Sequence, residues 1–411
     1  MSRLNTGDNV VESPFIIMDI GGFTFGKCAK AGDASKLGST FKITYPNFMK
    51  SLSIVKVNGS LNQYTINLEY AITQYDDPNL IDQVLATVSD TRKLKLTYGD
   101  WMMPAYIYRE EEAIITKVTS NVDMASSRIN YTINATSTAL SLNSGSQTFP
   151  AKNTKPSDEL KSLIKNNTSG ISQILYGMRD MGKVISNNLI ASNDKKVQLM
   201  SKTCSTLNYI SYLVNSMQNN SDSSNAAVGG STYFLTIHDD NKNMLGGPYF
   251  EVKEASADTV IDSYDTYTVD IGYPSDNFVS NFTIKNDDSW AILYKAAQAG
   301  SQPEYTYSID NDGKIVTSFS PSITTSSKYY TTTTLDKSWW TKVTQFPIQA
   351  TITIRGLLRP AMLMQYVRAN VYFYGKKHSS SGLYIITRQE DQINDYGYKT
   401  TLSLLRIKGD A

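Results

Sequence analysis

The segments QATITIRG (349–356), YVRANVYFYG (366–375), LYIITR (383–388) and YKTTLSLLRI (398–407) lie close together near the C-terminus and decide the fold. The first two alternate apolar and polar residues, which is the period of a strand with one buried face. Both of them end at a glycine, and NDYG (394–397) reverses the chain before the last segment. Glycine and asparagine at such positions are typical of hairpin turns. The stretch therefore predicts four strands, most of them joined as hairpins.

Length and composition bound the rest of the chain. Its 411 residues are too many for one ordinary core and indicate several domains. The 40% share of apolar residues is enough for real cores, and 27 Tyr against 13 Phe favour strands whose outer faces are wet. A net charge of +1 argues against a chain built mainly to neutralise nucleic-acid phosphates, although it leaves room for a local basic face.

The two cysteines, Cys28 and Cys204, form neither a metal-binding pair nor a disulfide framework. We expect both to be free thiols in cores. The N-terminal segment MSRLNTGD (1–8) lacks the apolar region of a signal peptide, and no apolar run approaches the about 20 residues that span a bilayer. We therefore expect a soluble protein of the reducing cytoplasm that does not insert into a membrane.

Residues 14–136 carry the pattern of a sheet. Turn glycines stand between strands at Gly21-Gly22 and Asn58-Gly59, and neither pair has the spacing of a phosphate-binding loop. Asp77, as N-cap, and Pro78 open one short helix that extends to residue 88. The expected strands are 14–20, 23–25, 41–45, 51–57, 63–72, 93–98, 105–108, 113–119 and 128–136.

The composition changes in the middle of the chain. Two segments rich in Ser, Asn and Gly (141–154 and 219–230) flank a region with helical periodicity. Beyond it, strand patterns return. The expected elements are helices from Pro156, over 171–190 and over 197–217, strands over 232–237, 249–252, 266–271 and 278–284, a helix over 290–297 and a hairpin over 305–319.

Two distant parts of the sequence repeat one pattern. Each has an aromatic triplet, a polar turn, an Ile-Ile-Thr segment and a Thr-rich closing strand. The matching segments are YIY (106–108) and YFY (372–374), IITK (114–117) and IITR (385–388), and the closing strands 131–136 and 400–405. Strands rich in Tyr, Ile and Thr also look alike by composition alone. A true duplication would give one chain two copies of a β-domain, which supply two places in a ring.

The patterns that resemble metal sites are incomplete. Asp239, Asn241 and Asn243 have the spacing of a calcium loop, but Met244 stands where the loop needs glycine and Phe250 where it needs glutamate. A turn is the better interpretation. Asp310 and Asp312 likewise lie in a turn sequence with no bidentate acid after them.

The inventory of reactive residues does not favour catalysis. The two histidines, His238 at a strand end and His378 in a turn, are expected to be solvated. Neither zinc-hydrolase nor nucleophile motifs are present. A pair of carboxylates for glycoside cleavage is not excluded by sequence. The acidic groups 110–112, 239–240 and 287–288 are expected to be solvated. We therefore expect no enzyme, no catalytic, cofactor-binding or metal site, and no cofactor.

The C-terminal motifs resemble the closing segment of phage tail hub proteins. In that family a G-x-Y-x-[IV] strand, a glycine-aromatic-x-T turn and an L-x-L-x-R strand end the second of two tube-like β-barrels. The chain holds these motifs at Gly382, Tyr384, Ile386, Gly397, Tyr398, Thr400, Leu402, Leu404 and Arg406. The resemblance is to the baseplate hub proteins of contractile tails and the related late control D proteins. Residues 391–395 stand where many members have a histidine, which leaves the subfamily open.

The resemblance implies a structural virion protein of the tail baseplate, assembled in the host cytoplasm. Hubs of this family are homotrimers whose two barrels per chain make a pseudo-sixfold ring. The ring adapts a sixfold tail tube to a threefold central spike and surrounds a channel. The implied partners are two further copies of the chain, the tail tube protein, the central spike protein and other baseplate proteins, with DNA passing without sequence-specific binding.

Together these observations predict a mainly β chain with a helical insertion (α+β). The expected domains are a first tube-like β-barrel (1–145), a helical linker region (146–230), a peripheral β-rich domain (231–345) and the closing segment of a second tube-like β-barrel (346–411). Two alternatives stay open, a tail-associated cell-wall hydrolase and a host-binding protein of the tail tip. The second needs an aromatic patch, for which Tyr329-Tyr330 and Trp339-Trp340 are the candidates.

Overall fold

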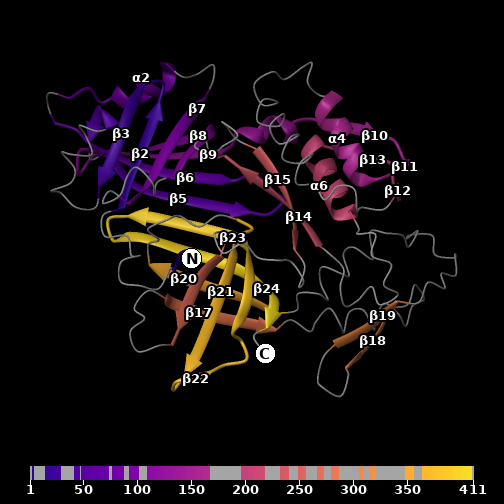
Figure 1. Cartoon of the computed structure of the whole chain (residues 1–411). Helices are drawn as coiled ribbons and strands as arrows, with labels where there is room; N and C mark the ends of the chain where they lie inside the picture. Colours follow the sequence, from indigo (N-terminus) through magenta and orange to yellow (C-terminus); the bar gives the residue numbers. More distant parts are fainter. Residues whose placement is uncertain are drawn as a thin grey trace.

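A computed structural model gives the arrangement of the chain (Figure 1). The structure describes residues 2–3, 14–28, 41–46, 48–73, 76–87, 92–100, 109–166, 196–217, 232–239, 249–255, 266–272, 279–286, 305–309, 315–319, 348–355 and 363–409. Most strands belong to one sheet of 16 strands, so the chain is mainly β as predicted. Among the described residues, no helix is long and apolar enough to cross a membrane.

The first half of the sheet, which we call the first lobe, curls around a core of inward-facing aliphatic and tyrosine side chains. Core residues alternate with polar ones along β6 (Gln63–Ala71) and β9 (Arg128–Ser137), as the sequence period requires. Asp77 accepts a hydrogen bond from the Asn79 backbone N–H (2.8 Å) at the start of the helix, the capping role predicted for it. The elements are β2 (Pro14–Ile20), β3 (Phe23–Cys28), β4 (Tyr45–Pro46), β5 (Met49–Val57), β6 (Gln63–Ala71), α2 (Leu80–Thr87), β7 (Lys93–Asp100), β8 (Arg109–Asp123) and β9 (Arg128–Ser137).

The second half of the sheet, the second lobe, has its own core. The four C-terminal strands predicted from the sequence are present, and the turn at 394–397 joins the last two. Two strands from the expected peripheral segment, β16 and β17, also pair into this lobe, beside β21 and β20. The elements are β1 (Ser2–Arg3), β16 (Thr266–Ile271), β17 (Val279–Asn286), β20 (Ile348–Arg355), β21 (Tyr366–Phe373), β22 (Lys376–Lys377), β23 (Gly382–Asn394) and β24 (Gly397–Gly409).

A third core, the third lobe, lies beside the sheet and contains the described helices of the middle region (Figure 1). The helix predicted over 197–217 is shorter than expected. Its first part forms two short strands that pair with residues 147–154, and the helix begins after Ser205, which caps it. The elements are η2 (Thr138–Asn143), β10 (Gln147–Phe149), β11 (Lys152–Thr154), α4 (Pro156–Asn166), β12 (Val197–Leu199), β13 (Lys202–Cys204), α6 (Thr206–Ser216), β14 (Thr232–His238) and β15 (Tyr249–Ala255).

The predicted hairpin over 305–319 is present as β18 (Tyr305–Ile309) and β19 (Ile315–Phe319). Several other expectations fall on residues outside the described part of the chain. They are the strand at 105–108, the helices at 171–190 and 290–297, the acids at 287–288, the paired residues Asp310 and Asp312, and the aromatic pairs at 329–330 and 339–340.

Five strands of the second lobe repeat five strands of the first in chain order and in pairing. In the first lobe β5, β6, β9, β8 and β7 are neighbours in that order, and in the second β17, β20, β24, β23 and β21 are. All of these neighbouring pairs are antiparallel in both lobes. The strand that takes the place of β21 in the first lobe is β7. The YIY segment matched to YFY in the sequence lies outside the described part of the chain.

Two β-bulges also recur at matching places in the two lobes. The register shifts lie between Met49 and Ser51 in β5 and between Val279 and Asn281 in β17, and between Ile115 and Lys117 in β8 and between Ile386 and Arg388 in β23. The IITK and IITR segments thus occupy equivalent positions. Similar composition alone does not place the same irregularities at the same points, because a bulge depends on the local pairing. The five strands form a structural repeat.

Candidate assembly interface

The two lobes are joined edge to edge by strands β23 and β5, which lie side by side in Figure 1. The first part of β23 pairs with β21 inside the second lobe, through residues 382–385. Its second part leaves that partner and pairs antiparallel with β5, from Arg388 opposite Val57 to Ile393 opposite Leu52. The long strand β23 is thus shared between the lobes, which makes the sheet continuous across the joint.

Side chains of the β23–β24 hairpin complete the core of the first lobe. Ile393 and Tyr398 are buried and pack in the first-lobe core although they belong to the second-lobe strands. At the tip of the hairpin, Asp395 forms an ion pair with Lys27 on β3. The joint therefore combines backbone pairing with apolar burial, and the two lobes form one packed unit.

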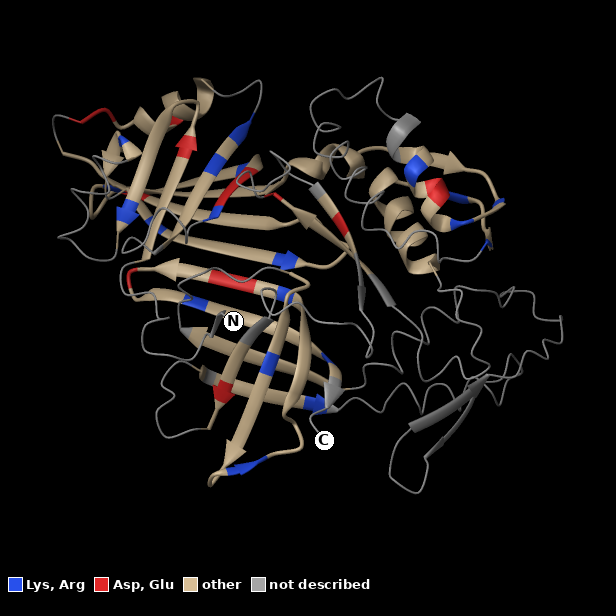
Figure 2. Ribbon diagram, viewed as in Figure 1, with Lys and Arg blue, Asp and Glu red and all other residues tan. Residues whose placement is uncertain are grey.

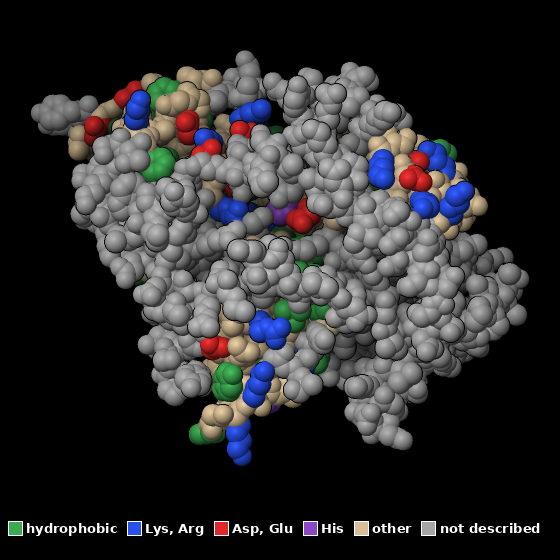
Figure 3. Space-filling model, in the orientation of Figure 1, with side chains coloured by type: hydrophobic (Ala, Val, Ile, Leu, Met, Phe, Trp, Pro, Cys, Tyr) green, Lys and Arg blue, Asp and Glu red, His purple; other side chains and the backbone are tan. Residues whose placement is uncertain are grey.

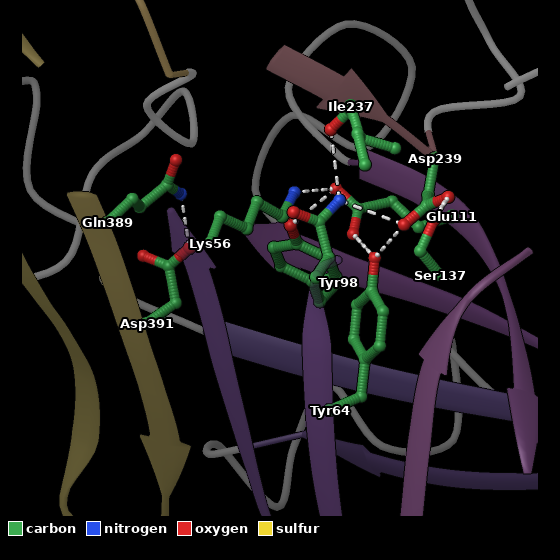
Figure 4. A network of polar contacts seen from close by, with 10 residues as sticks. Lys56, Tyr64, Tyr98, Glu111, Ser137, Ile237, Asp239, Gln389 and Asp391 are labelled. Atoms are coloured by element: carbon green, nitrogen blue, oxygen red, sulfur yellow. Dashed lines mark hydrogen bonds and ion pairs between the residues drawn. The ribbon is translucent and has the colours of Figure 1, made fainter. Parts of the chain in front are cut away.

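A buried polar network lies next to the joint (Figure 4). Lys56 on β5 forms an ion pair with Glu111 on β8, and only 1% of the Glu111 side chain is exposed. The hydroxyl groups of Tyr64 and Tyr98 donate hydrogen bonds to the Glu111 carboxylate at 2.8 and 3.0 Å. Side chains from three strands of the first lobe, β5, β6 and β7, thus converge on a single carboxylate of β8.

The network continues into the third lobe through Asp239, directly after β14. Its carboxylate accepts hydrogen bonds from Asn62 (2.8 Å) and Ser137 (2.7 Å), and it shares the proton of the Tyr64 hydroxyl (3.0 Å) with Glu111. All three partners lie in or beside the first lobe. The preceding residue, His238, contacts Glu251 on β15 at 2.7 Å. The contacts of Asp239 hold β14, and with it the third lobe, against the first lobe.

A third buried carboxylate lies at the joint itself. Asp391 on β23 is fully buried and accepts hydrogen bonds from the Thr400 hydroxyl (2.7 Å) and from the Gln389 side-chain amide. Gln389 is the register partner of Lys56 across the joint. Polar groups from both lobes therefore meet along the joint between β5 and β23.

Burial and partners set the ionisation of these acids in opposite directions. Burial alone would raise the pKa of the Glu111 carboxyl, but the Lys56 ammonium and the tyrosine hydroxyl outweigh it and hold that pKa below its usual range. Burial raises the pKa of Asp239, and the hydrogen bonds from Ser137 and Asn62 offset only part of the shift. The pKa of Asp391 is raised in the same way, with Thr400 as the main opposing donor.

The network holds the lobes together and offers little space for a substrate. Its open part, lined by Lys56, Arg109, Glu111, His238 and Asp239, has room on the scale of a water molecule. In the space-filling view, basic, acidic and histidine side chains meet in a hollow in the middle of the drawn face (Figure 3). Within the described ranges no group of His, Cys, Asp or Glu could hold a metal ion. The Glu111 carboxylate already interacts with a lysine and two tyrosine hydroxyls, so its role is to hold these strands together.

Two acids and one histidine that were expected to be solvated are buried in the structure. Glu111, Asp239 and His238 are all largely inaccessible, whereas His378 lies exposed in its turn as expected. The signal for Glu111 was present, because it continues the buried phase of β8 with Ala113 and Ile115. Asp239 and His238 have no such signal, since their partners come from distant segments. Neither cysteine is in a disulfide, and both are partly buried.

No protein-family model matches the chain, and no curated protein matches it. Its structure is similar to those of phage tail proteins and secretion-system proteins. The tail protein from Neisseria meningitidis MC58 has 9% sequence identity and a TM-score of 0.47, with 96% of each chain covered. The 43 kDa tail protein of prophage MuSo2 from Shewanella oneidensis has 9% identity and a TM-score of 0.48, with 95% of this chain and 96% of that chain covered.

A third similar structure is the E. coli c3393 protein, described as a component of the type VI secretion system with structural similarity to the phage T4 tail proteins gp27 and gp5. Its identity is 8% and its TM-score 0.46, with 88% of this chain and 74% of that chain covered.

Proposed function

We propose that the chain is a structural hub of a phage tail baseplate, a homotrimer whose six repeated units form a ring. The observation that carries the proposal is the five-strand repeat, joined edge to edge through β5 and β23. A chain with two equivalent units in sequence has the geometry that an adaptor between sixfold and threefold partners needs. Three copies supply six similar places in the ring while the assembly keeps only threefold symmetry.

The outer face of the sheet supports a role in surrounding DNA. On β6 the side chains facing away from the core are Gln63, Thr65, Asn67 and Glu69, and the neighbouring strands present similar groups. Asn67 accepts a hydrogen bond from Thr132 on β9 (3.0 Å) and donates one to Ser51 on β5 (2.8 Å). The sheet is mostly uncharged, and its basic and acidic residues are scattered over it without forming a patch of one sign (Figure 2).

In the proposed ring this face lines the channel. Hydroxyl and amide groups remain hydrated next to a polyanion without binding its phosphates, whereas a row of lysines would release counterions and hold the DNA. DNA would then pass without sequence-specific contacts. The tail tube and the central spike would bind the two rims of the ring, and the third lobe would face other baseplate proteins.

Electron microscopy of the purified full chain tests this proposal. Class averages of the assembled particle should show six similar densities around a central hole, with three additional densities outside them from the third lobe. Particles with one or two lobed densities and no hole, at concentrations where the protein is fully assembled by mass, would contradict the ring.

A further inference from the structure

Two strand edges of the sheet have no strand partner among the described residues. In the repeat, β8 corresponds to β23 and β17 corresponds to β5, and the joint inside the chain uses β23 and β5. Residues 117–123 of β8 pair with β9 on one side only, and β17 pairs only with β20. The strands equivalent to the two sides of the joint, β8 and β17, are therefore present, but their edges are not paired with each other within the described part of the chain.

Side chains along the open edges of β8 and β17 are exposed. Every residue from 116 to 123 is exposed, including Val118 (38%) and Val122 (55%), and Ile284 on β17 is 36% exposed. The positions equivalent to these three are Gln389, Ile393 and Ile54, which are buried in the internal joint. Apolar residues therefore occupy the buried phase of a joint, on an edge where nothing in the described part of the chain covers them.

The edges also match in direction and register. In the internal joint Ile393 lies opposite Leu52 and Arg388 opposite Val57. The equivalences follow from the shared bulges and pairings, which align Lys117 with Arg388 and Ser53 with Thr283. Transferring the register predicts the pairs Val122 with Phe282, Asn121 with Thr283, Ser120 with Ile284, and Thr119 with Lys285.

We propose that the free edge of β8 in one copy pairs antiparallel with β17 of a second copy of this chain. The contact continues the sheet from copy to copy in the way β23 and β5 continue it inside the chain, and it buries Val122 and Ile284. An exposed edge of this length otherwise invites uncontrolled pairing. Because the two surfaces differ, the contact is head-to-tail and closes into a ring when the rotation permits. The inference rests on the proposed ring and names its contact between copies.

Disulfide cross-linking tests the register in the full chain. Directly opposite residues of an antiparallel pair lie about 4.5–5.5 Å apart between Cα atoms, within the range that a disulfide spans. The variant N121C/T283C should therefore form covalent oligomers up to a closed trimer under mild oxidation. The matched control is N121C/T351C, since Thr351 is the β20 neighbour of Thr283, about 4.8 Å further from the edge. The variant S53C/Q392C should form a disulfide within one chain across the internal joint.

A second variant tests the apolar contact. Val122→Asp changes a residue that is exposed in the single chain, so the fold should be retained, but it would bury an unpaired carboxylate in the contact. Assembly should weaken by about a hundredfold in dissociation constant, measured by light scattering across a dilution series. The matched control Phe373→Asp, at an exposed apolar position (57%) on β21 of the second lobe, should leave assembly unchanged.

The outcomes separate this inference from the proposed function. Covalent trimers with N121C/T283C but not with N121C/T351C support the pairing. A protein that is trimeric by mass but forms no 121–283 cross-link, while S53C/Q392C does form its disulfide, overturns the pairing and leaves the ring proposal intact. A protein that is monomeric at all concentrations and forms no cross-link between copies overturns both.

Discussion

Replacing Lys56 by methionine tests whether the buried network stabilises the first lobe and the joint. The change keeps the apolar stem on β5 and removes the ammonium that pairs with Glu111. The Lys56 side chain is 12% exposed and that of Glu111 is 1% exposed, so the remaining carboxylate would stay buried. Removing one partner of a buried ion pair costs about 3–5 kcal/mol. Since two tyrosine hydroxyls still donate to Glu111, we expect the lower end, about 3 kcal/mol.

The matched control lies on the same strand. Lys50 of β5 forms an ion pair with Glu69 at 3.1 Å, but its side chain is 40% exposed. Lys50→Met should change the unfolding free energy by less than about 1 kcal/mol, because exposed pairs contribute little. In Lys56→Met/Glu111→Gln the buried charge is removed as well, so part of the lost stability should return. Urea unfolding followed by circular dichroism at pH 7 compares the four proteins.

The pH dependence of this variant has a definite sign. In the native protein the pKa of Glu111 lies below its usual range, so its contribution to stability is present above the unfolded pKa and lost as pH falls through the folded pKa. Without Lys56, burial dominates and favours the protonated acid. The difference between Lys56→Met and the native protein should therefore be largest at neutral pH and shrink on acidification. A difference no larger than that of Lys50→Met at pH 7 would refute the reasoning.

Two further predictions concern a glycine and a buried acid. Gly272 has a φ of +79°, and a Cβ there would lie 2.2 Å from the backbone oxygen of Tyr372, so Gly272→Ala should cost about 3 kcal/mol or more in chemical unfolding. Gly375→Ala, with a φ of +77° and open space around it, should cost only about 1 kcal/mol; equal losses in the two variants would be inconsistent with the close approach. For Asp239, whose pKa burial raises, the stabilising contribution is full below the unfolded pKa and is lost as pH rises through the folded pKa. Asp239→Asn should remove this dependence, so a stability difference between Asp239→Asn and the native protein that stays constant from about pH 4 to pH 7 would disprove the assignment.

Local patterns were enough to predict many of the strands. The alternation in QATITIRG and YVRANVYFYG became β20 and β21, because one face of each is buried in the second-lobe core. Asn58-Gly59 lies between β5 and β6, and Gly59 has the positive φ that such a turn requires. The prediction succeeded where period and turn residues agreed.

Long-range pairing was not readable in the same way. Residues 202–204 form a strand instead of part of the helix predicted over 197–217, because residues 147–149 pair with them. The joint between β23 and β5 likewise depends on which strand ends are left free after each lobe has formed. Glu111 was the exception among the network residues, since an acid in the buried phase of a strand pattern indicates by itself that a buried partner is needed.

The mass of the purified full chain in solution tests the central claim most directly. One chain has a mass of 45.7 kDa. Light scattering, on the protein alone and with its candidate spike protein, should give a homotrimer, about three times this value. A mass of one chain under both conditions, at every concentration measured, would contradict the ring.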